Sequence, residues 1–387
     1  MSPEVAVVGC GMSNFGAYSG DAFPRVESVV DDALRDAGLA AEDVDEAWWA
    51  SLAFGGGQLG NPAALVNGIE GLQGVAAHRV ENACASGGYA VRSALQAIEA
   101  GRCEVALVVG FERMNDQPSH RSGYWLGVSG ETPWERMAGT TFPGVYGLMA
   151  SRHAHEHGTT REQLAQVAVK NHRFAADNPN AQFSKEVGLE RVMDSPTVAD
   201  PLRLFDCCGT TDGAAALVLT SAARADQIDA EATTITGAGA ASDHLALHER
   251  PSLTELSATR TAGEEALREA GRSIEEVDLA EVHDCFTIAE ILAIEDLGLA
   301  GKGEGGPATA EGRTDRGGAC VVNPSGGLKG KGHPLGATGV AQVAEIHDQL
   351  LSRAGDRQIA DAETGLTHNV GGSGATCAVH VLERGGT

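Results

Sequence analysis

A cysteine with small neighbours stands at the junction of two apolar segments in the first part of the chain. Cys84 follows the apolar run 74–80 and precedes the periodic apolar residues of 89–98. This pattern predicts a strand, a tight turn and a helix, with the thiol in the turn. The positive end of a helix dipole favours a thiolate, and small neighbours let a substrate carbonyl approach the backbone. A buried structural cysteine is the alternative, because free cysteines are often buried.

Two further polar segments stand where strands are predicted to end in the second part of the chain. His283 and Cys285 lie between an apolar strand and the helix 287–297, and His333 lies in a glycine-rich turn. Reacting groups of α/β proteins gather at the carboxyl ends of strands. His333 could activate the Cys84 thiol, and a second cysteine could remove a proton next to a carbonyl. Histidine and backbone N–H groups could hold the developing oxyanion, so the set indicates acyl transfer from a thioester.

The elements that position these residues are predicted to come from a duplicated scaffold. Segment 31–38 resembles segment 264–271, and at the same offset 42–45 resembles 275–278. Each copy has the pattern of an amphipathic helix that ends at glycine, followed by an acidic turn and an apolar strand. Two unrelated acidic helices would rarely share helix, cap and turn in this order, so we expect two like halves.

Strands and helices alternate in both halves, which predicts parallel sheets covered by helices on both faces. The halves are expected to span 1–230 and 231–387. They differ by an insertion of roughly 111–206 in the first half, which is expected to help bind substrate. The alternating histidines of 153–157 in this insertion are interpreted as a polar helix end and not as a metal tract.

Composition excludes several classes of function. The chain has 387 residues and a formal net charge of −25, and only five of its 28 basic residues are lysines. This balance favours a salt-rich cytoplasm, with an acidic mesophilic protein as the alternative. No basic stripe suits nucleic acid, and no apolar stretch is long enough for a membrane span. The eight cysteines include no Cys-x-x-Cys pair, so we expect reduced thiols, no metal and a cytoplasmic location.

Five motifs, in order over essentially the whole chain, resemble those of the thiolases, in the branch of the sterol-carrier-protein-2-type and archaeal enzymes. They are Asn-Ala-Cys-Ala-Ser-Gly-Gly (82–88), His-Asp-Cys-Phe (283–286), Asn-Pro-Ser-Gly-Gly (323–327), Gly-His-Pro-Leu-Gly-Ala-Thr-Gly (332–339) and His-Asn-Val-Gly-Gly (368–372). The resemblance implies a five-layer αβαβα sandwich of two like halves. It also implies a homodimer or homotetramer that acts on acyl esters of coenzyme A, with no permanently bound cofactor.

The resemblance also implies roles for the site residues. Cys84 would accept the acyl group, and His333 would activate its thiol. His283 would stand where other thiolases have asparagine and would help to hold the thioester oxygen. The backbone N–H groups of Cys84 and Gly371 would form a second oxyanion hole.

The chain departs from the better-known thiolase pattern at one position. That pattern has a catalytic cysteine two residues before the glycine equivalent to Gly371, and this chain has Asn369 there. In the branch with the His-Asp-Cys-Phe motif, the acid/base cysteine is the one in that motif, so Cys285 inherits the role. Cys377 is expected to be structural.

Coenzyme A carries several negative charges, so a protein this acidic needs a local basic patch. The candidates, on charge alone, are Arg173, Arg203, Lys329 and Lys331. Solvated surface ions are the alternative interpretation of these four side chains. Archaeal relatives work beside a small OB-fold, zinc-ribbon-like companion protein, and some assemble with HMG-CoA synthase. This chain contains no such module, so a partner chain is expected.

The leading prediction is an acetyl-CoA C-acetyltransferase that forms acetoacetyl-CoA or cleaves a 3-oxoacyl-CoA. It would work through an acyl-Cys84 with ping-pong kinetics, in the metabolism of lipid or isoprenoid precursors or of polyhydroxyalkanoate. Two alternatives stay open, a carbon–carbon lyase (retro-aldolase) of the same fold and a non-catalytic scaffold that binds acyl-CoA. The lyase would not need an acyl-cysteine, and the scaffold would be expected to lose one of the two motif cysteines.

Overall fold

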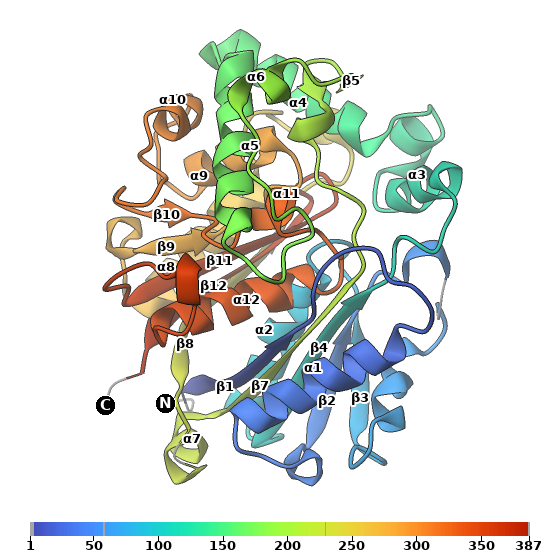
Figure 1. Cartoon of the computed structure of the whole chain (residues 1–387), viewed down its shortest axis with the longest axis vertical. Coiled ribbons are helices and arrows are strands. Elements are labelled where there is room, and N and C mark those ends of the chain that lie inside the picture. Colours follow the sequence, from blue (N-terminus) through green and yellow to red (C-terminus); the bar gives the residue numbers. More distant parts are fainter. Residues whose placement is uncertain (1–3, 57–58, 229, 386–387) are drawn as a thin grey trace.

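The computed structural model describes residues 4–56, 59–228 and 230–385 (Figure 1). Two blocks of strands, one from each part of the chain, are joined where β1 pairs with β8. The first block contains β1 (Val5–Met12), β2 (Glu46–Ala50), β3 (Ala76–Val80), β4 (Val105–Glu112) and β7 (Gly213–Ser221). The second contains β8 (Thr233–Ser242), β9 (Leu279–Glu281), β10 (Val321–Val322), β11 (Thr364–Gly371) and β12 (Thr376–Arg384).

Each strand has an equivalent in the other block, with the same neighbours and the same direction. The order from the outer edge is β3-β2-β4-β7-β1 in the first block and β10-β9-β11-β12-β8 in the second. β2 is parallel to β3 and β4, and β9 is likewise parallel to β10 and β11. β7 is antiparallel to β4 and β1, and β12 is antiparallel to β11 and β8. The predicted duplication is therefore confirmed.

The expectation of parallel sheets was wrong, because both blocks are mixed. β11 and β12 are joined by a short turn, which can connect only antiparallel neighbours. An alternation of apolar strands and helices does not distinguish this arrangement from a parallel one. A strand that is buried on both faces is apolar whether it runs parallel or antiparallel to its neighbours.

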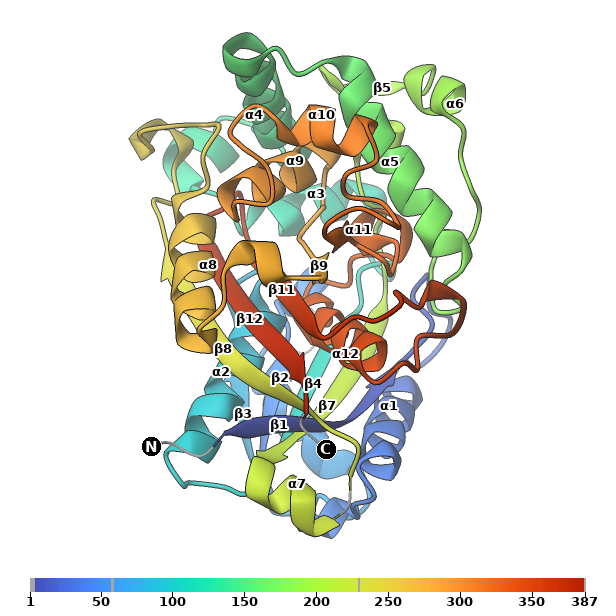
Figure 2. The same cartoon turned by 90° about the vertical axis from the view of Figure 1, so that its left-hand side faces the viewer.

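Helices form three layers around the strands. α1 (Phe23–Asp36) covers the outer face of the first block, and α8 (Ser257–Ala270) covers the outer face of the second (Figures 1 and 2). These two helices contain the repeated segments. α2 (Ser86–Glu99) and α12 (Thr338–Leu350) lie between the blocks. The five-layer αβαβα sandwich is thus confirmed.

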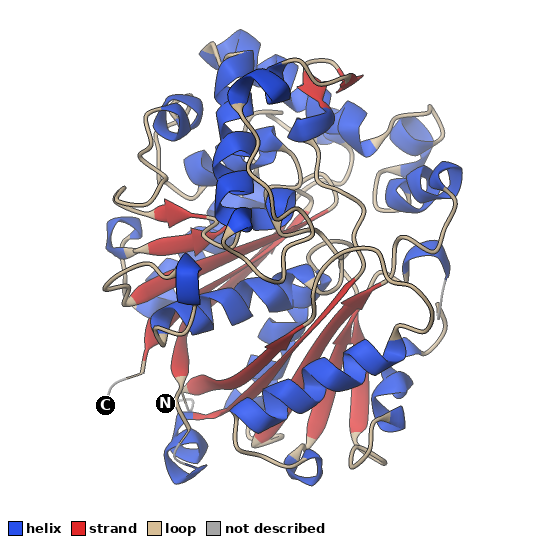
Figure 3. Ribbon diagram, in the orientation of Figure 1, coloured by secondary structure: helices blue, strands red, loops and turns tan. Residues whose placement is uncertain are grey.

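The two blocks differ most between their fourth and fifth strands in chain order. The chain from β4 to β7 forms a cap of helices, whereas the equivalent β11 and β12 meet in the short turn (Figure 3). The cap contains α3 (Ser119–Gly127), η4 (Thr132–Arg136), α4 (Phe142–His157), α5 (Arg161–Ala176), α6 (Leu189–Met193), β5 (Thr197–Ala199), β6 (Leu202–Arg203) and η5 (Leu204–Asp206).

The second block adds helices to this cap. They are α9 (Thr287–Asp296), α10 (Gly305–Ala310) and α11 (Gly327–Gly330). The remaining helices are α7 (Ala222–Ile228), η1 (Ala41–Asp43), η2 (Phe54–Gly56), η3 (Pro62–Gly68), η6 (Leu247–Glu249), η7 (Ile274–Glu276) and η8 (Gly355–Arg357). Within the described residues, no helix is both long enough and apolar enough to cross a bilayer.

The largest apolar core lies between the two blocks. Val91 and Leu95 of α2 and Val340 and Ile346 of α12 are buried there against the inner faces of the strands. Close packing of this kind fixes the position of the helix ends as well as their axes. The core therefore determines where the two turns that precede α2 and α12 lie.

Candidate active site

Cys84 lies in a tight turn between β3 and α2, as the sequence predicts. Ala83, directly before it, has a φ of 51°, which lies in the left-handed region that residues with a side chain seldom adopt. Ser86 Oγ donates to Ala83 O at 2.6 Å and accepts from Asn82 N–H at 3.0 Å. These bonds hold the strained turn in place.

The N-terminal ends of α2 and α12 meet at a glycine contact. A Cβ atom on Gly339 would lie 2.2 Å from Gly88 N and 2.3 Å from Asn369 Oδ1, which is too close for any side chain. Only glycine permits this approach of two helix ends. The contact brings the turn with His333, before α12, against the turn with Cys84, before α2.

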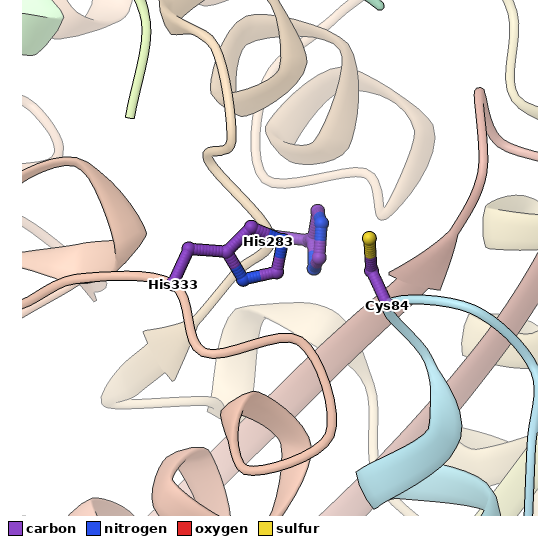
Figure 4. A group of neighbouring side chains, drawn as sticks. All are labelled: Cys84, His283 and His333. Atoms are coloured by element: carbon purple, nitrogen blue, oxygen red, sulfur yellow. The ribbon is translucent and has the colours of Figure 1, made fainter. Parts of the chain in front are cut away.

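Three of the predicted catalytic side chains meet at this contact (Figure 4). Cys84 Sγ and one ring nitrogen each from His283 and His333 all lie within 4.8 Å of one another. The two imidazole rings are nearly perpendicular, at 86°, with centroids 4.9 Å apart. All three residues are buried. His283 follows β9, so both halves contribute to the group.

Cys285, the fourth predicted residue, lines a cavity of about 110 Å³ together with Cys84 and His333. The other lining residues are Met114, Leu126, Ser129, Phe142, Pro143, Cys207, Cys208, Gly209, Thr210, Phe286, Leu335 and Gly372. Most of the surface is apolar, and the inserted segment between β4 and β7 supplies much of it. A small apolar cavity of this kind suits a short acyl group beside a reactive thiol.

A chain of hydrogen bonds fixes the proton of His333. Thr338 Oγ1 donates to Pro334 O at 2.9 Å, so its hydrogen is not available to the imidazole. The same oxygen lies 2.7 Å from His333 Nδ1, which must therefore donate to it. Burial lowers the pKa of His333 to about 3, so the ring is neutral and has this one proton. Nε2 is left as an unprotonated nitrogen without a protein partner in the described residues, able to accept a proton.

The Cys84 thiol is protonated at rest. Burial, with a smaller contribution from nearby Glu112, raises its pKa to about 12, although hydrogen bonds from the amides of Gly372 and of Cys84 itself act in the opposite direction. The expectation that the helix end favours a resting thiolate was therefore wrong, because burial raises the pKa more than the nearby backbone N–H groups lower it. The thiol proton must leave during the attack on substrate, and His333 Nε2 is the nearby base that can take it.

Cys285 is a thiol at rest as well, because burial raises its pKa well above the usual value. A hydrogen bond with Tyr146 acts in the opposite direction. Tyr146 is buried, stacks on Phe286 with centroids 4.6 Å apart, and donates its hydroxyl to Gly372 O at 3.2 Å. Tyr146 was not predicted from the sequence. Its only signal is an isolated tyrosine in an apolar helix of the inserted segment.

Asp284, between the two reactive residues of its motif, has a structural role. Its carboxylate accepts from Leu328 N at 2.6 Å, Lys329 N at 3.2 Å and Asn171 Nδ2 at 2.7 Å. The first two bonds satisfy backbone donors at the start of α11. Asp284 therefore anchors the motif to α11 and α5 while its neighbours reach the site.

Gly371 ends β11 beside the turn with Cys84. A Cβ atom on Gly371 would lie 2.4 Å from Asn82 O, so only glycine fits. The amides that bond to the Cys84 sulfur are nevertheless those of Cys84 itself and of Gly372, which also lines the cavity. The assignment of the Gly371 N–H to an oxyanion hole stays a prediction, and Gly372 joins it as a candidate.

Two of the four proposed coenzyme A ligands are not accessible to a phosphate. Lys329 is 3% exposed and donates its ammonium to Cys207 O at 2.6 Å. Lys331 is 2% exposed and lies 3.4 Å from Glu281 Oε2. The prediction was wrong for these lysines, because separating a buried ammonium from its internal partners would cost a large amount of free energy. Their charge was visible in the sequence, but their burial was not.

The two arginines differ from the lysines. Arg173 is exposed and forms an ion pair with Asp315, and Arg203 is half-buried and donates to Ser195 O at 2.8 Å. Neither lines the cavity with Cys84. Their assignment to the phosphates of coenzyme A stays a prediction.

The spacing of the three ligand atoms at Cys84, His283 and His333 would also permit a metal ion, so the expectation of no metal stays untested. A second group with such spacing, Cys10, Asp36 and His347, lies away from the cavity. Arg353 donates two hydrogen bonds to Asp36 there, at 2.7 and 3.1 Å, and balances its charge.

Comparison with known proteins identifies related chains. Residues 5–223 match the family described as "Thiolase, N-terminal domain", and residues 239–384 match "Thiolase C-terminal domain-like". An acetyl-CoA acetyltransferase of Methanothermobacter thermautotrophicus is 43% identical over 98% of this chain and 100% of its own length. Human sterol carrier protein 2 is 34% identical over 96% of this chain and 70% of its own length.

Solved structures agree with these matches. The structure "Ltp2-ChsH2(DUF35) aldolase" superposes with a TM-score of 0.83 and 25% identity, over 99% of this chain and 98% of that chain. An acetyl-CoA acetyltransferase from Syntrophomonas wolfei has a TM-score of 0.75 over the full length of both chains, at 19% identity, and shares the fold.

Proposed function

Because the chain belongs to the thiolase family, in the branch with archaeal and sterol-carrier-protein-2-type members, we propose that it is an acetyl-CoA acetyltransferase. It condenses two acetyl-CoA molecules into acetoacetyl-CoA, or cleaves a 3-oxoacyl-CoA with free coenzyme A. The proposal rests on one observation, the meeting of a buried thiol with two histidines beside a cavity that a second thiol lines. Coenzyme A enters as substrate, and no permanently bound cofactor is needed.

The first half-reaction forms an acyl-enzyme. Cys84 Sγ attacks the thioester carbonyl carbon while His333 Nε2 takes the thiol proton. The bond from this carbon to the coenzyme A sulfur then breaks, and His333 returns the proton to the leaving sulfur. An N–H group of His283 and backbone amides near Cys84 stabilise the negative oxygen.

The second half-reaction makes the carbon–carbon bond. Cys285 gives its proton to His333 and, as thiolate, removes a proton from the methyl group of a second acetyl-CoA. The resulting enolate attacks the acyl carbon, and the bond to Cys84 Sγ breaks. His333 then returns its proton to Cys84, so both thiols regain their resting state. The Tyr146 hydroxyl, which donates to Gly372 O at rest, lies beside Cys285 and can turn to donate to this thiolate.

A carbon–carbon lyase is the second candidate, because the aldolase structure superposes over nearly the whole chain. The two functions differ in the need for an acyl-enzyme. An acetyltransferase exchanges isotopically labelled coenzyme A into acetyl-CoA without a second substrate, and a lyase does not. We expect this exchange from the purified chain and none from Cys84→Ser, with iodoacetamide blocking the exchange and acetyl-CoA protecting against the block.

We also propose that the chain works in an assembly. The solved aldolase pairs its chain with a DUF35 subunit, and several large apolar side chains are exposed on the inserted segment of this chain. They include Tyr124, Trp134 and Met137, at 59%, 73% and 79% exposure. A homodimer or homotetramer, a small companion protein and HMG-CoA synthase stay the proposed partners. Light scattering of the pure chain, with and without a co-expressed companion, distinguishes them.

The charge balance supports a salt-rich, reducing cytoplasm as the proposed setting. Three of the five lysines are buried in internal bonds, so the basic groups at the surface are almost all arginines. The formal charge of −25 opposes folding unless salt screens it. We expect the thermal midpoint to rise steeply with potassium chloride, and a midpoint that is independent of salt would contradict this setting.

A further inference from the structure

Asn369 lies between the reactive groups of the two halves. It stands near the end of β11, is 1% exposed, and has hydrogen-bond partners on three sides. Its side chain contacts the backbone of α2 at Gly88, the carbonyl of Cys84, and the ring of His283. A side chain with this position links the nucleophile directly to the histidine that is expected to hold the substrate oxygen.

The contacts determine which way the Asn369 amide points. Gly88 N–H donates to one amide atom at 3.0 Å, and a backbone N–H can only donate, so this atom is the oxygen Oδ1. The other atom is therefore Nδ2. It lies 3.0 Å from the carbonyl oxygen of Cys84, which can only accept. Two independent partners thus agree on one orientation of the amide.

This orientation determines the proton of His283. Asn369 Nδ2 also lies 3.4 Å from His283 Nδ1, and the amide nitrogen can donate hydrogen bonds but cannot accept them. His283 Nδ1 must then accept and has no proton. Burial, with His333 and His368 nearby, lowers the pKa of His283 well below its usual value, so the ring is neutral. Its single proton is on Nε2, which has no protein partner in the described part of the chain.

The backbone of His283 is fixed in the same region. Its N–H donates to His368 Nδ1 at 3.3 Å, and His368 Nε2 lies 2.9 Å from Thr259 Oγ1. The contact with Asn369 therefore acts on an imidazole whose main chain is already held.

We infer that Asn369 is a positioning residue that holds His283 in the tautomer with the proton on Nε2. His333 is held in the opposite tautomer by Thr338, so one neutral histidine is a base and the other is a donor. An Nε2–H of His283 near the thiol can donate a hydrogen bond to a thioester oxygen as that oxygen becomes negative. This catalytic benefit rests on the proposed function. The tautomer itself does not depend on that function.

The direct test is the nitrogen NMR spectrum of the full chain with ¹⁵N-labelled histidine, with the His283 signals assigned by their loss in His283→Asn. In the wild type at neutral pH, we expect His283 Nδ1 to give the signal of an unprotonated, pyridine-type ring nitrogen. In Asn369→Asp, a carboxylate replaces the amide donor and can only accept. His283 Nδ1 should then become protonated and give a pyrrole-type signal.

Thr338→Val is the matched control, because it removes the partner of the other histidine and leaves Asn369 in place. It should shift the signals of His333 and leave those of His283 unchanged, whereas Asn369→Asp should shift His283. If Asn369→Asp does not fold, Asn369→Leu removes the donor without adding a charge and should shift the His283 Nδ1 signal away from the wild-type value.

Two results would overturn the inference. A protonated Nδ1 on His283 in the wild type would contradict the tautomer, and unchanged His283 signals in the folded Asn369 variant would contradict the role of Asn369. Loss of the predicted function would be seen separately, as absence of coenzyme A exchange in the wild type with the expected NMR signals intact. If both hold, Asn369→Asp should slow that exchange by about 10²–10³-fold, the loss typical of one oxyanion donor.

Discussion

The two halves of the molecule use equivalent elements for opposite chemical tasks. The turn before α2 in the first half presents Cys84, the proposed nucleophile, and the turn before α12 in the second half presents His333, its proposed base. The equivalent helices cross at Gly339, where no side chain fits. Duplication thus brings two like turns to one point, where one carries the proposed nucleophile and the other its proposed base.

The halves differ more at the next connection along the chain. In the first half the inserted segment between β4 and β7 supplies much of the cavity, while in the second half a short turn between β11 and β12 places Gly372 against Cys84. The common scaffold therefore fixes where the chemistry happens, and the difference between the halves determines what can enter.

The largest effect is expected from Cys285→Ala, which removes the proposed acid/base thiol of the second half and leaves the pair of Cys84 and His333 intact. Turnover should fall by about 10⁴-fold, the upper end for loss of a general base. Acylation should continue, so acetyl-enzyme should accumulate and be visible by mass. Equal loss of acylation and turnover would show that Cys285 does not act in the second step alone.

Gly339→Ala tests the crossing of the two helices. Its methyl group would collide with Gly88 N, so we expect a loss of at least about 3 kcal/mol of stability, seen as a lower thermal midpoint. Gly123→Ala is the matched control, because a Cβ atom on that helical glycine meets nothing within 4 Å. Similar midpoints for the two variants would contradict the close contact.

Thr338→Val tests the proposed role of His333 as the base without changing His333 itself. The valine keeps the shape of threonine but cannot accept the proton of His333 Nδ1, so Nε2 is no longer fixed as the unprotonated nitrogen. We expect about a tenfold slower acylation of Cys84, corresponding to about 1.4 kcal/mol, measured by rapid-quench kinetics. A wild-type rate would mean that other contacts fix the imidazole.

The smallest effect is expected from pH. The pKa of Cys84 is raised to about 12 and that of His333 is lowered to about 3, so neither group changes its charge between these limits. The acylation rate should therefore vary little between about pH 5 and about pH 9. Glu112, with a pKa raised to about 7 by burial, adds at most a small decrease above neutrality, because its charge disfavours a thiolate. A steep rise centred near neutrality would indicate a resting thiolate–imidazolium pair instead.

The sequence was sufficient for features that depend on local pattern. The repeated helices became α1 and α8. Cys84, His283, Cys285 and His333, which the structure brings together, were predicted as site residues from their places at strand ends. These features are local, since a turn or a helix face is encoded in a few adjacent residues. The neighbours of Asn369 could not be found this way, because its three partners are 86 to 285 residues away along the chain.

Electrostatic predictions failed for a related reason. The ammonium groups of Lys329 and Lys331 and the thiol of Cys84 were assigned properties of exposed groups, and all three are buried. Burial depends on the packing of both halves, which composition does not reveal. Burial reverses the expected behaviour of these groups. A buried ammonium binds its internal partner and not a phosphate, and a buried thiol keeps its proton.

An acetyltransferase of this kind must take up an acyl group on Cys84, and intact-protein mass spectrometry after addition of acetyl-CoA in high salt detects that group. We expect a gain of one acetyl group in the wild type and in Cys285→Ala, and no gain in Cys84→Ser. The absence of an adduct from folded wild-type chain that still binds coenzyme A would contradict the acyl-enzyme and favour the lyase or the scaffold.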